Sequence, residues 1–133
     1  MEKTYRGSCH CGAVRIEATF DLAEGTRRCN CSFCTKARIW EVIVPAADFR
    51  LLAGGDELET YRFGENFRHP FCRHCGTRPF GTGHVPAIGG DIVYVNVACL
   101  DGIDPTLLAE VPMTHPDGRN DAWWEEAAET RHL

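Results

Sequence analysis

The arrangement of the cysteines limits what this chain can be more than any other feature of its sequence. Eight cysteines occur in 133 residues, and seven of them fall into three tight clusters. The clusters have the spacings CxC, CxCxxC and CxxC, and their members are Cys9 and Cys11, then Cys29, Cys31 and Cys34, then Cys72 and Cys75. Cysteines two or three residues apart are poorly placed to bridge one another, but their sulfurs can converge on one metal ion.

The rest of the composition is that of an ordinary acidic globular chain, for which we expect one domain over residues 1–133. A formal net charge of −5 argues against nucleic acid or an anionic membrane surface as a partner. No apolar run approaches the roughly 20 residues that span a bilayer, and the N-terminal segment lacks the apolar stretch of a signal peptide. We therefore expect a cytoplasmic location, where thiols stay reduced and a disulfide framework is disfavoured.

Hydrophobic alternation predicts a mainly β fold of short strands. Thirteen glycines and seven prolines agree with many turns. Strands are expected at 13–20, 39–44 and 91–98, and a hairpin is expected to pair 49–52 with 58–63. This order places the cysteine clusters between strands, so the clusters can meet only if the sheets fold over one another.

Helical signals are confined to the last third of the chain. A short helix is expected near Pro105–Glu110, and a C-terminal helix near Ala122–Thr130, with Asp121 as its N-cap. The segment 112–120 reads as an irregular connection between them. The sequence thus favours a mainly β domain with a short C-terminal helix.

Seven clustered sulfurs divide naturally into four and three. Structural zinc is normally held by four protein ligands, whereas catalytic zinc usually has three and an open position. The two pairs can close a four-thiolate zinc site made of Cys9, Cys11, Cys72 and Cys75. The triplet Cys29, Cys31 and Cys34 then forms a three-thiolate zinc site, so that we expect two zinc ions per chain.

Spacing alone leaves alternatives open. These are a single metal cluster with unused cysteines, an iron–sulfur cluster, and a disulfide-rich secreted fold. Cys99 is favoured as a buried core thiol over a fourth metal ligand. Surface or supporting positions are favoured over ligation for the histidines near the motifs, which are His10, His69, His74 and His84.

A three-thiolate zinc is a weak Lewis acid that is well suited to accept a fourth sulfur. A thiol that binds zinc loses its proton, so the predicted chemistry is thiol activation, with carbon–sulfur bond formation or cleavage. A basic run close to the triplet could offset the thiolate charge or hold a substrate carboxylate, and its members are Arg27, Arg28, Lys36 and Arg38.

Four motifs, in this order, resemble the glutathione-dependent formaldehyde-activating enzyme family, whose domain is shared by centromere protein V. They are GSCHCGAV, CNCSFCTK, FCRHCGT and VNVACLDGID. The resemblance covers a core of about residues 5–105 and leaves 106–133 as a tail. It implies a β-tent fold of small antiparallel sheets with two zinc ions. The structural zinc would map onto Cys9, Cys11, Cys72 and Cys75, and the catalytic zinc onto Cys29, Cys31 and Cys34, facing the glutathione thiol.

The resemblance further implies a carbon–sulfur lyase that resembles S-hydroxymethylglutathione synthase. Its partners would be glutathione or a similar small thiol and an aldehyde such as formaldehyde. A second class of function stays open, in which the chain is a non-catalytic zinc-binding or scaffolding domain of the same fold.

Overall fold

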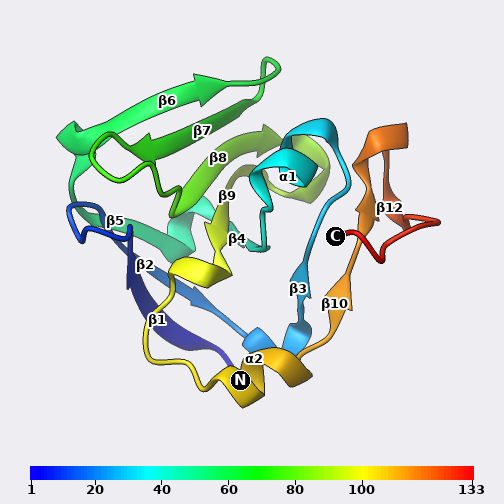
Figure 1. Ribbon diagram of the computed structural model, residues 1–133, viewed down its shortest axis with the longest axis horizontal. Coiled ribbons are helices and arrows are strands. Elements are labelled where there is room, and N and C mark those ends of the chain that lie inside the picture. The colour runs from blue at the N-terminus through cyan, green and yellow to red at the C-terminus, as the bar shows by residue number, and fades with distance from the viewer.

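The computed structural model describes residues 1–133 as a mainly β molecule built from small sheets (Figure 1). A three-stranded antiparallel sheet has the order β1 (Lys3–Ser8), β2 (Arg15–Phe20), β5 (Phe49–Ala53). A two-stranded antiparallel sheet is formed by β11 (Pro116–Asp117) and β12 (Ala122–Glu126). The expected mainly β fold of small sheets is therefore confirmed.

The largest sheet has seven strands and is antiparallel apart from its parallel β10–β3 edge. In spatial order its strands are β10 (Met113–Thr114), β3 (Thr26–Arg27), β4 (Glu41–Pro45), β9 (Gly90–Asn96), β8 (Phe80–Val85), β7 (Phe67–Cys72) and β6 (Leu58–Arg62). Two α-helices complete the regular structure, α1 (Ser32–Ala37) and α2 (Pro105–Glu110), together with single turns of 3₁₀ helix. Neither α-helix has the length and apolar character that crossing a membrane requires.

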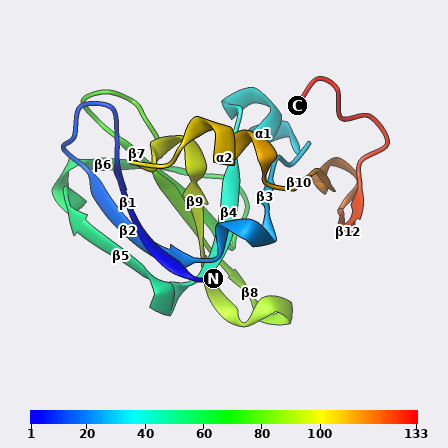
Figure 2. The same ribbon diagram turned by 90° about the horizontal axis from the view of Figure 1, so that it is seen from below.

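The core lies between the three-stranded sheet and one face of the seven-stranded sheet, two layers that Figure 2 shows edge-on. In β2 every second residue is buried, as the alternating sequence predicts. Its partners in the core include valines at alternate positions of β4 and β9, namely Val42, Val44, Val93 and Val95. The side chains that alternate with these valines, among them Glu41 and Tyr94, therefore lie on the opposite face of the sheet, which we call the outer face.

The expected hairpin of residues 49–52 and 58–63 is wrong. Instead, β5 pairs with β2, and β6 pairs with β7 in the other sheet. The chain turns a corner at Gly54, which has φ +86° and lies so close to Ala13 that a Cβ would stand 2.2 Å from its carbonyl oxygen. A β-like pattern on both sides of a glycine turn does not reveal that the two strands belong to different sheets.

The expected C-terminal helix is also wrong, although the helix at Pro105–Glu110 is confirmed. Residues 122–126 form β12, and Asp121 does not cap a helix but adopts a left-handed conformation with φ +56°. Its carboxylate accepts a hydrogen bond from the Trp123 indole at 2.8 Å. The segment 112–120 is not irregular either, because it contains β10 and β11. The expected strand at 91–98 ends at Asn96, so that Cys99 lies in a 3₁₀ turn.

Candidate metal centres and their surroundings

The structure brings the outer two cysteine clusters together. Cys9 and Cys11 follow β1, whereas Cys72 ends β7 and Cys75 lies in the turn beyond it. The four sulfurs lie within 4.8 Å of one another. Cys11 Sγ is 3.6 Å from both Cys9 Sγ and Cys72 Sγ. We call this set the four-cysteine cluster.

The donor set of the four-cysteine cluster fits a tetrahedral metal ion. Bonds of about 2.3 Å from zinc to four thiolates place the sulfurs about 3.8 Å apart, close to the observed separations. Cys9 and Cys72 are buried and belong to the hydrophobic core, and the Val14 amide donates a hydrogen bond to Cys9 Sγ at 3.3 Å. The side-chain hydroxyl of Thr77 is the main cause that lowers the pKa of Cys75 to about 5. A metal bound here would therefore tie two sheets together through the core.

The middle cluster forms a second, separate site around the start of α1. Cys29 follows β3, Cys31 is the N-cap of α1, and Cys34 lies in its first turn. Their sulfurs lie within 4.8 Å of one another, and we call them the three-cysteine cluster. Backbone amides point at the sulfurs, since Cys29 Sγ accepts a hydrogen bond from the Cys31 amide at 3.2 Å and Cys31 Sγ accepts one from the Cys34 amide at 3.3 Å.

These surroundings favour a thiolate at Cys31. Hydrogen bonds from the Cys29 and Cys34 thiols, followed by the amides of Cys34 and Phe33, lower the pKa of Cys31 well below its usual value. Unpaired amides at a helix start favour negative charge. The sequence analysis placed this cluster between strands and missed α1, because a six-residue helix capped by a cysteine has no strong sequence signal.

The outer face of the seven-stranded sheet lies close to the three-cysteine cluster, because the charge of Cys31 acts on Glu41 of this face. Glu41 is buried there, with its carboxylate 3.4 Å from Arg27 Nε on the neighbouring strand β3. Burial raises the pKa of Glu41 to about 7, although the positive charges of Arg27 and Arg78 oppose the rise. Both arginines are thus close enough to Glu41 to act on the charge of its carboxylate.

The C-terminal hairpin β11–β12 closes one side of the three-cysteine cluster. The buried Asn30 amide donates a hydrogen bond to Asp117 at 2.8 Å, and its oxygen accepts one from the Arg119 amide at 2.9 Å. Gly118 lies between Asp117 and Arg119 in the chain. A Cβ at Gly118 would stand 2.8 Å from Cys29 Sγ and 2.5 Å from the Trp123 ring. The tail is therefore packed directly against a cysteine of the site.

We expect Gly118→Ala to loosen this hairpin. Added volume in such a close contact destabilises by about 1–3 kcal/mol, which corresponds to a fall in Tm of about 3–5 °C per kcal/mol at this length. Metal affinity at the three-cysteine cluster should fall with it, as a chelator competition would measure. Gly55→Ala is the matched control, because its Cβ would meet only Leu51 at 3.6 Å. Equal behaviour of the two variants would contradict the packing role of Gly118.

Neither cluster includes Cys99 or a histidine. Cys99 is buried, and this burial raises its pKa to about 11, as suits a core thiol. His74 lies at the surface 2.7 Å from the Glu57 carboxylate, and His84 lies at the surface 2.8 Å from the Asp91 carboxylate. His10 is exposed.

His69 differs from the other three histidines, because it is buried on the outer face. Burial and then the charge of Arg78 lower its pKa to about 4.

The basic run singled out in the sequence is dispersed by the fold. Arg27 faces Glu41, whereas the Arg28 guanidinium lies 5.1 Å from the centre of the Trp40 ring. Arg38 donates a hydrogen bond to the His132 carbonyl at 2.6 Å. Arg78, which the sequence analysis did not select, lies close enough to the three-cysteine cluster for the charges of Cys34 and Cys31 to act on it. Its signal in the sequence was its position three residues after Cys75, directly beyond the turn that carries Cys72 and Cys75.

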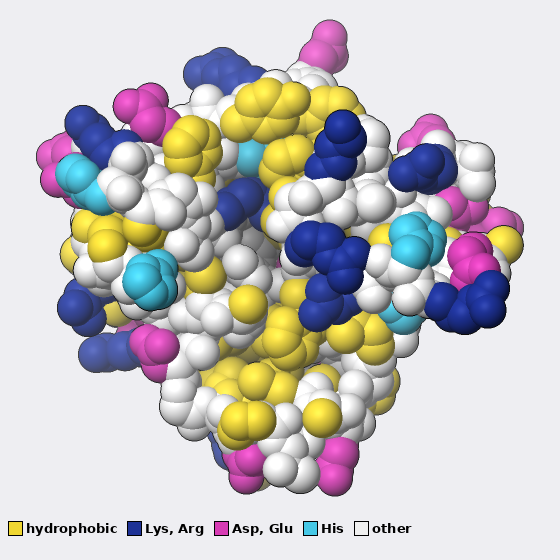
Figure 3. Space-filling view, in the orientation of Figure 1, with side chains coloured by type: hydrophobic (Ala, Val, Ile, Leu, Met, Phe, Trp, Pro, Cys, Tyr) yellow, Lys and Arg dark blue, Asp and Glu magenta, His cyan; other side chains and the backbone are white.

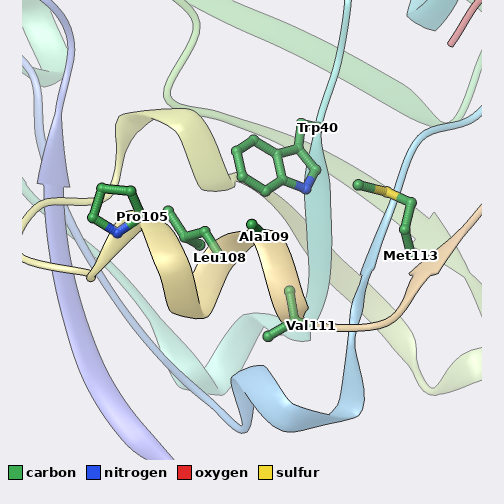
Figure 4. Close-up of a pocket in the computed structure, with 6 residues that line it drawn as sticks. All are labelled: Trp40, Pro105, Leu108, Ala109, Val111 and Met113. Carbon is green, nitrogen blue, oxygen red and sulfur yellow. The ribbon is translucent and has the colours of Figure 1, made fainter.

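Two surface pockets lie beside α2 and α1. The first, of about 430 Å³, is bounded by Trp40, α2 and Met113, and Figure 4 shows its apolar side chains converging without a titratable group. The second, of about 410 Å³, lies on the side of α1 formed by Phe33 and Lys36, with Tyr61 and Phe63 opposite. Neither pocket has a cysteine among its lining residues.

Comparisons with known proteins cover most of the chain. A family model described as glutathione-dependent formaldehyde-activating enzyme matches residues 4–115. Among solved structures, a crystal structure of a Rhodobacter sphaeroides protein from a structural genomics programme is similar, with 38% sequence identity and a TM-score of 0.68. The alignment spans 82% of this chain and 99% of that one.

Proposed function

The chain belongs to the glutathione-dependent formaldehyde-activating enzyme family, and from this premise we propose that it is a zinc-dependent carbon–sulfur lyase. Its substrates are glutathione or a similar small thiol and an aldehyde such as formaldehyde, which it joins reversibly. The observation that carries the proposal is the division of the cysteines into a set of four and a set of only three.

The two sets suit different roles. Four sulfurs, two of them in the hydrophobic core, supply every ligand of a tetrahedral ion, so we assign the four-cysteine cluster to a structural zinc. Three sulfurs leave one position of a tetrahedral ion for another ligand, so we assign Cys29, Cys31 and Cys34 to a catalytic zinc. Zinc bound there supplies one kind of chemistry, namely an electrophilic centre that takes up a thiol sulfur and favours loss of its proton.

The residues around the three-cysteine cluster determine how a thiol can reach it. Gly118 lies against Cys29, so the C-terminal hairpin covers that side of the cluster. The amides at the start of α1 stabilise negative charge on Cys31. In the addition itself, the thiol loses its proton, a carbon–sulfur bond forms at the aldehyde carbon, and the aldehyde oxygen gains a proton. The reverse reaction breaks the same bond.

The hairpin also supports treating residues 1–133 as one domain. Its contacts with Asn30 and Cys29 join the tail to the core that the family resemblance covers. We therefore propose that the tail is part of the functional unit.

The proposal is tested by measuring exchange between glutathione, formaldehyde and S-hydroxymethylglutathione with exchange NMR. Zinc-loaded protein is expected to raise the exchange rate in proportion to its concentration, and Cys31→Ser is expected to return the rate to that of buffer. A rate equal to that of buffer with the wild-type protein, at two bound zinc ions per chain, would favour the non-catalytic zinc-binding or scaffolding domain.

A further inference from the structure

Arg78 occupies a place on the outer face that the backbone leaves open for it. The residue lies between the four-cysteine cluster and β8. At Gly81 in β8 a Cβ would stand 2.6 Å from Arg78 Nη2, so the absence of a side chain there makes room for the guanidinium. Gly81 pairs with Tyr94 of β9, on the same face as Glu41. The guanidinium therefore lies on the same outer face as Glu41, close to the three-cysteine cluster.

The contacts of Arg78 fix its orientation without neutralising its charge. One Nη shares a hydrogen bond of 2.9 Å with His69 Nδ1, and the guanidinium lies 5.2 Å from the centre of the Phe33 ring. His69 is a neutral partner at pH 7, because burial keeps its pKa low. No carboxylate forms an ion pair with Arg78 within 4.0 Å, whereas Arg27 faces Glu41.

Most of the hydrogen-bonding capacity of Arg78 is unused within the protein. A guanidinium has five N–H donors, and only the bond to His69 engages one of them. Nε is buried without any partner, which is unfavourable for a donor on a charged group. Burial lowers the pKa of Arg78, whereas the negative charges of Glu41, Cys34 and Cys31 oppose this shift. A cation of this kind is ready to receive an anion from outside the chain.

We propose that Arg78 is a specificity-determining residue that binds the carboxylate of the thiol substrate while its sulfur occupies the three-cysteine cluster. This inference rests on the proposed function. A guanidinium matches a carboxylate with two parallel hydrogen bonds, and the guanidinium of Arg78 lies over the Phe33 ring of the segment that carries the three-cysteine cluster. Figure 3 shows a hollow near the middle of the molecule, beside α1, with a basic side chain and a histidine in its wall.

The experiment compares two thiols of similar size on cobalt-loaded protein. 3-Mercaptopropionate carries a carboxylate and 2-mercaptoethanol does not. The cobalt absorption spectrum gives an apparent Kd for each thiol. Wild-type protein is expected to prefer 3-mercaptopropionate by at least about tenfold, as a charge-assisted hydrogen bond implies. Arg78→Gln should remove this preference and leave the Kd of 2-mercaptoethanol unchanged.

Two further variants keep the test independent of folding. Gly81→Ala retains the arginine but displaces its guanidinium, so it should reduce the preference. Arg73→Gln alters an exposed arginine in the turn between Cys72 and Cys75 and should keep the preference. Cobalt content and Tm are measured for each variant. Persistence of the preference in Arg78→Gln and Gly81→Ala would overturn the role of Arg78 but leave the thiol site standing. No spectral response to either thiol in the wild type would overturn the proposed function itself, and the role of Arg78 with it.

Discussion

Replacing Cys72 by serine is expected to lower the stability of this protein more than any other single substitution considered. Cys72 is fully buried at the end of β7 and belongs both to the four-cysteine cluster and to the hydrophobic core. Binding of a structural metal contributes directly to folding free energy, so the loss of one thiolate should remove at least about 4 kcal/mol. This corresponds to a fall in Tm of about 12–20 °C.

Thermal unfolding followed by circular dichroism, together with the metal content of the purified protein, measures this effect. The matched control is Cys99→Ala, which removes a buried sulfur that lies outside both clusters. We expect the control to keep its full metal content and to lose only the packing of one small side chain. Similar losses in the two variants would mean that Cys72 acts as a core residue and holds no metal.

Replacing Cys31 by serine is expected to have the opposite profile, with a loss of thiol binding and a largely intact fold. Cys31 caps α1, and its sulfur accepts a hydrogen bond from the Cys34 amide. Serine is among the preferred N-cap residues, so its hydroxyl can take over this bond and preserve the start of the helix. Loss of one of only three sulfurs should still weaken metal and thiol binding at the three-cysteine cluster by more than about 100-fold.

The comparison with Cys72→Ser makes this prediction sharp. Cys31→Ser should retain about one metal ion per chain, keep its Tm within a few degrees of wild type and show no thiol-dependent change in a cobalt spectrum. If Cys31→Ser and Cys72→Ser destabilise the fold equally, the two clusters do not have separate structural and catalytic roles.

The grouping of the cysteines could be predicted from the sequence because it depends on local spacing. Cys9 and Cys11, or Cys72 and Cys75, are held together by their own turns whatever the rest of the fold does. With the pairs fixed in this way, few combinations remain, and the structure brings together the same four and the same three. Alternation in β2 was equally local, and its buried face follows directly from the pattern.

The features that could not be predicted depend on contacts between distant segments. Residues 122–126 form β12 in a hairpin that Asn30 anchors through hydrogen bonds with Asp117 and Arg119, which are 87 and 89 residues away in the sequence. Arg78 likewise gained its place from the register that sets Gly81 opposite Tyr94. Composition favoured a helix for the tail, and tertiary contacts overrode it.

The most direct test of the central claim is a titration of the cobalt-loaded wild-type protein with glutathione. The claim is that Cys29, Cys31 and Cys34 hold a metal ion with one position that a thiol can fill. We predict about two metal ions per chain and a saturable change in the cobalt absorption, with more intense sulfur-to-cobalt charge-transfer bands as a fourth sulfur binds. A spectrum that glutathione and other small thiols leave unchanged, with both ions bound, would contradict the claim.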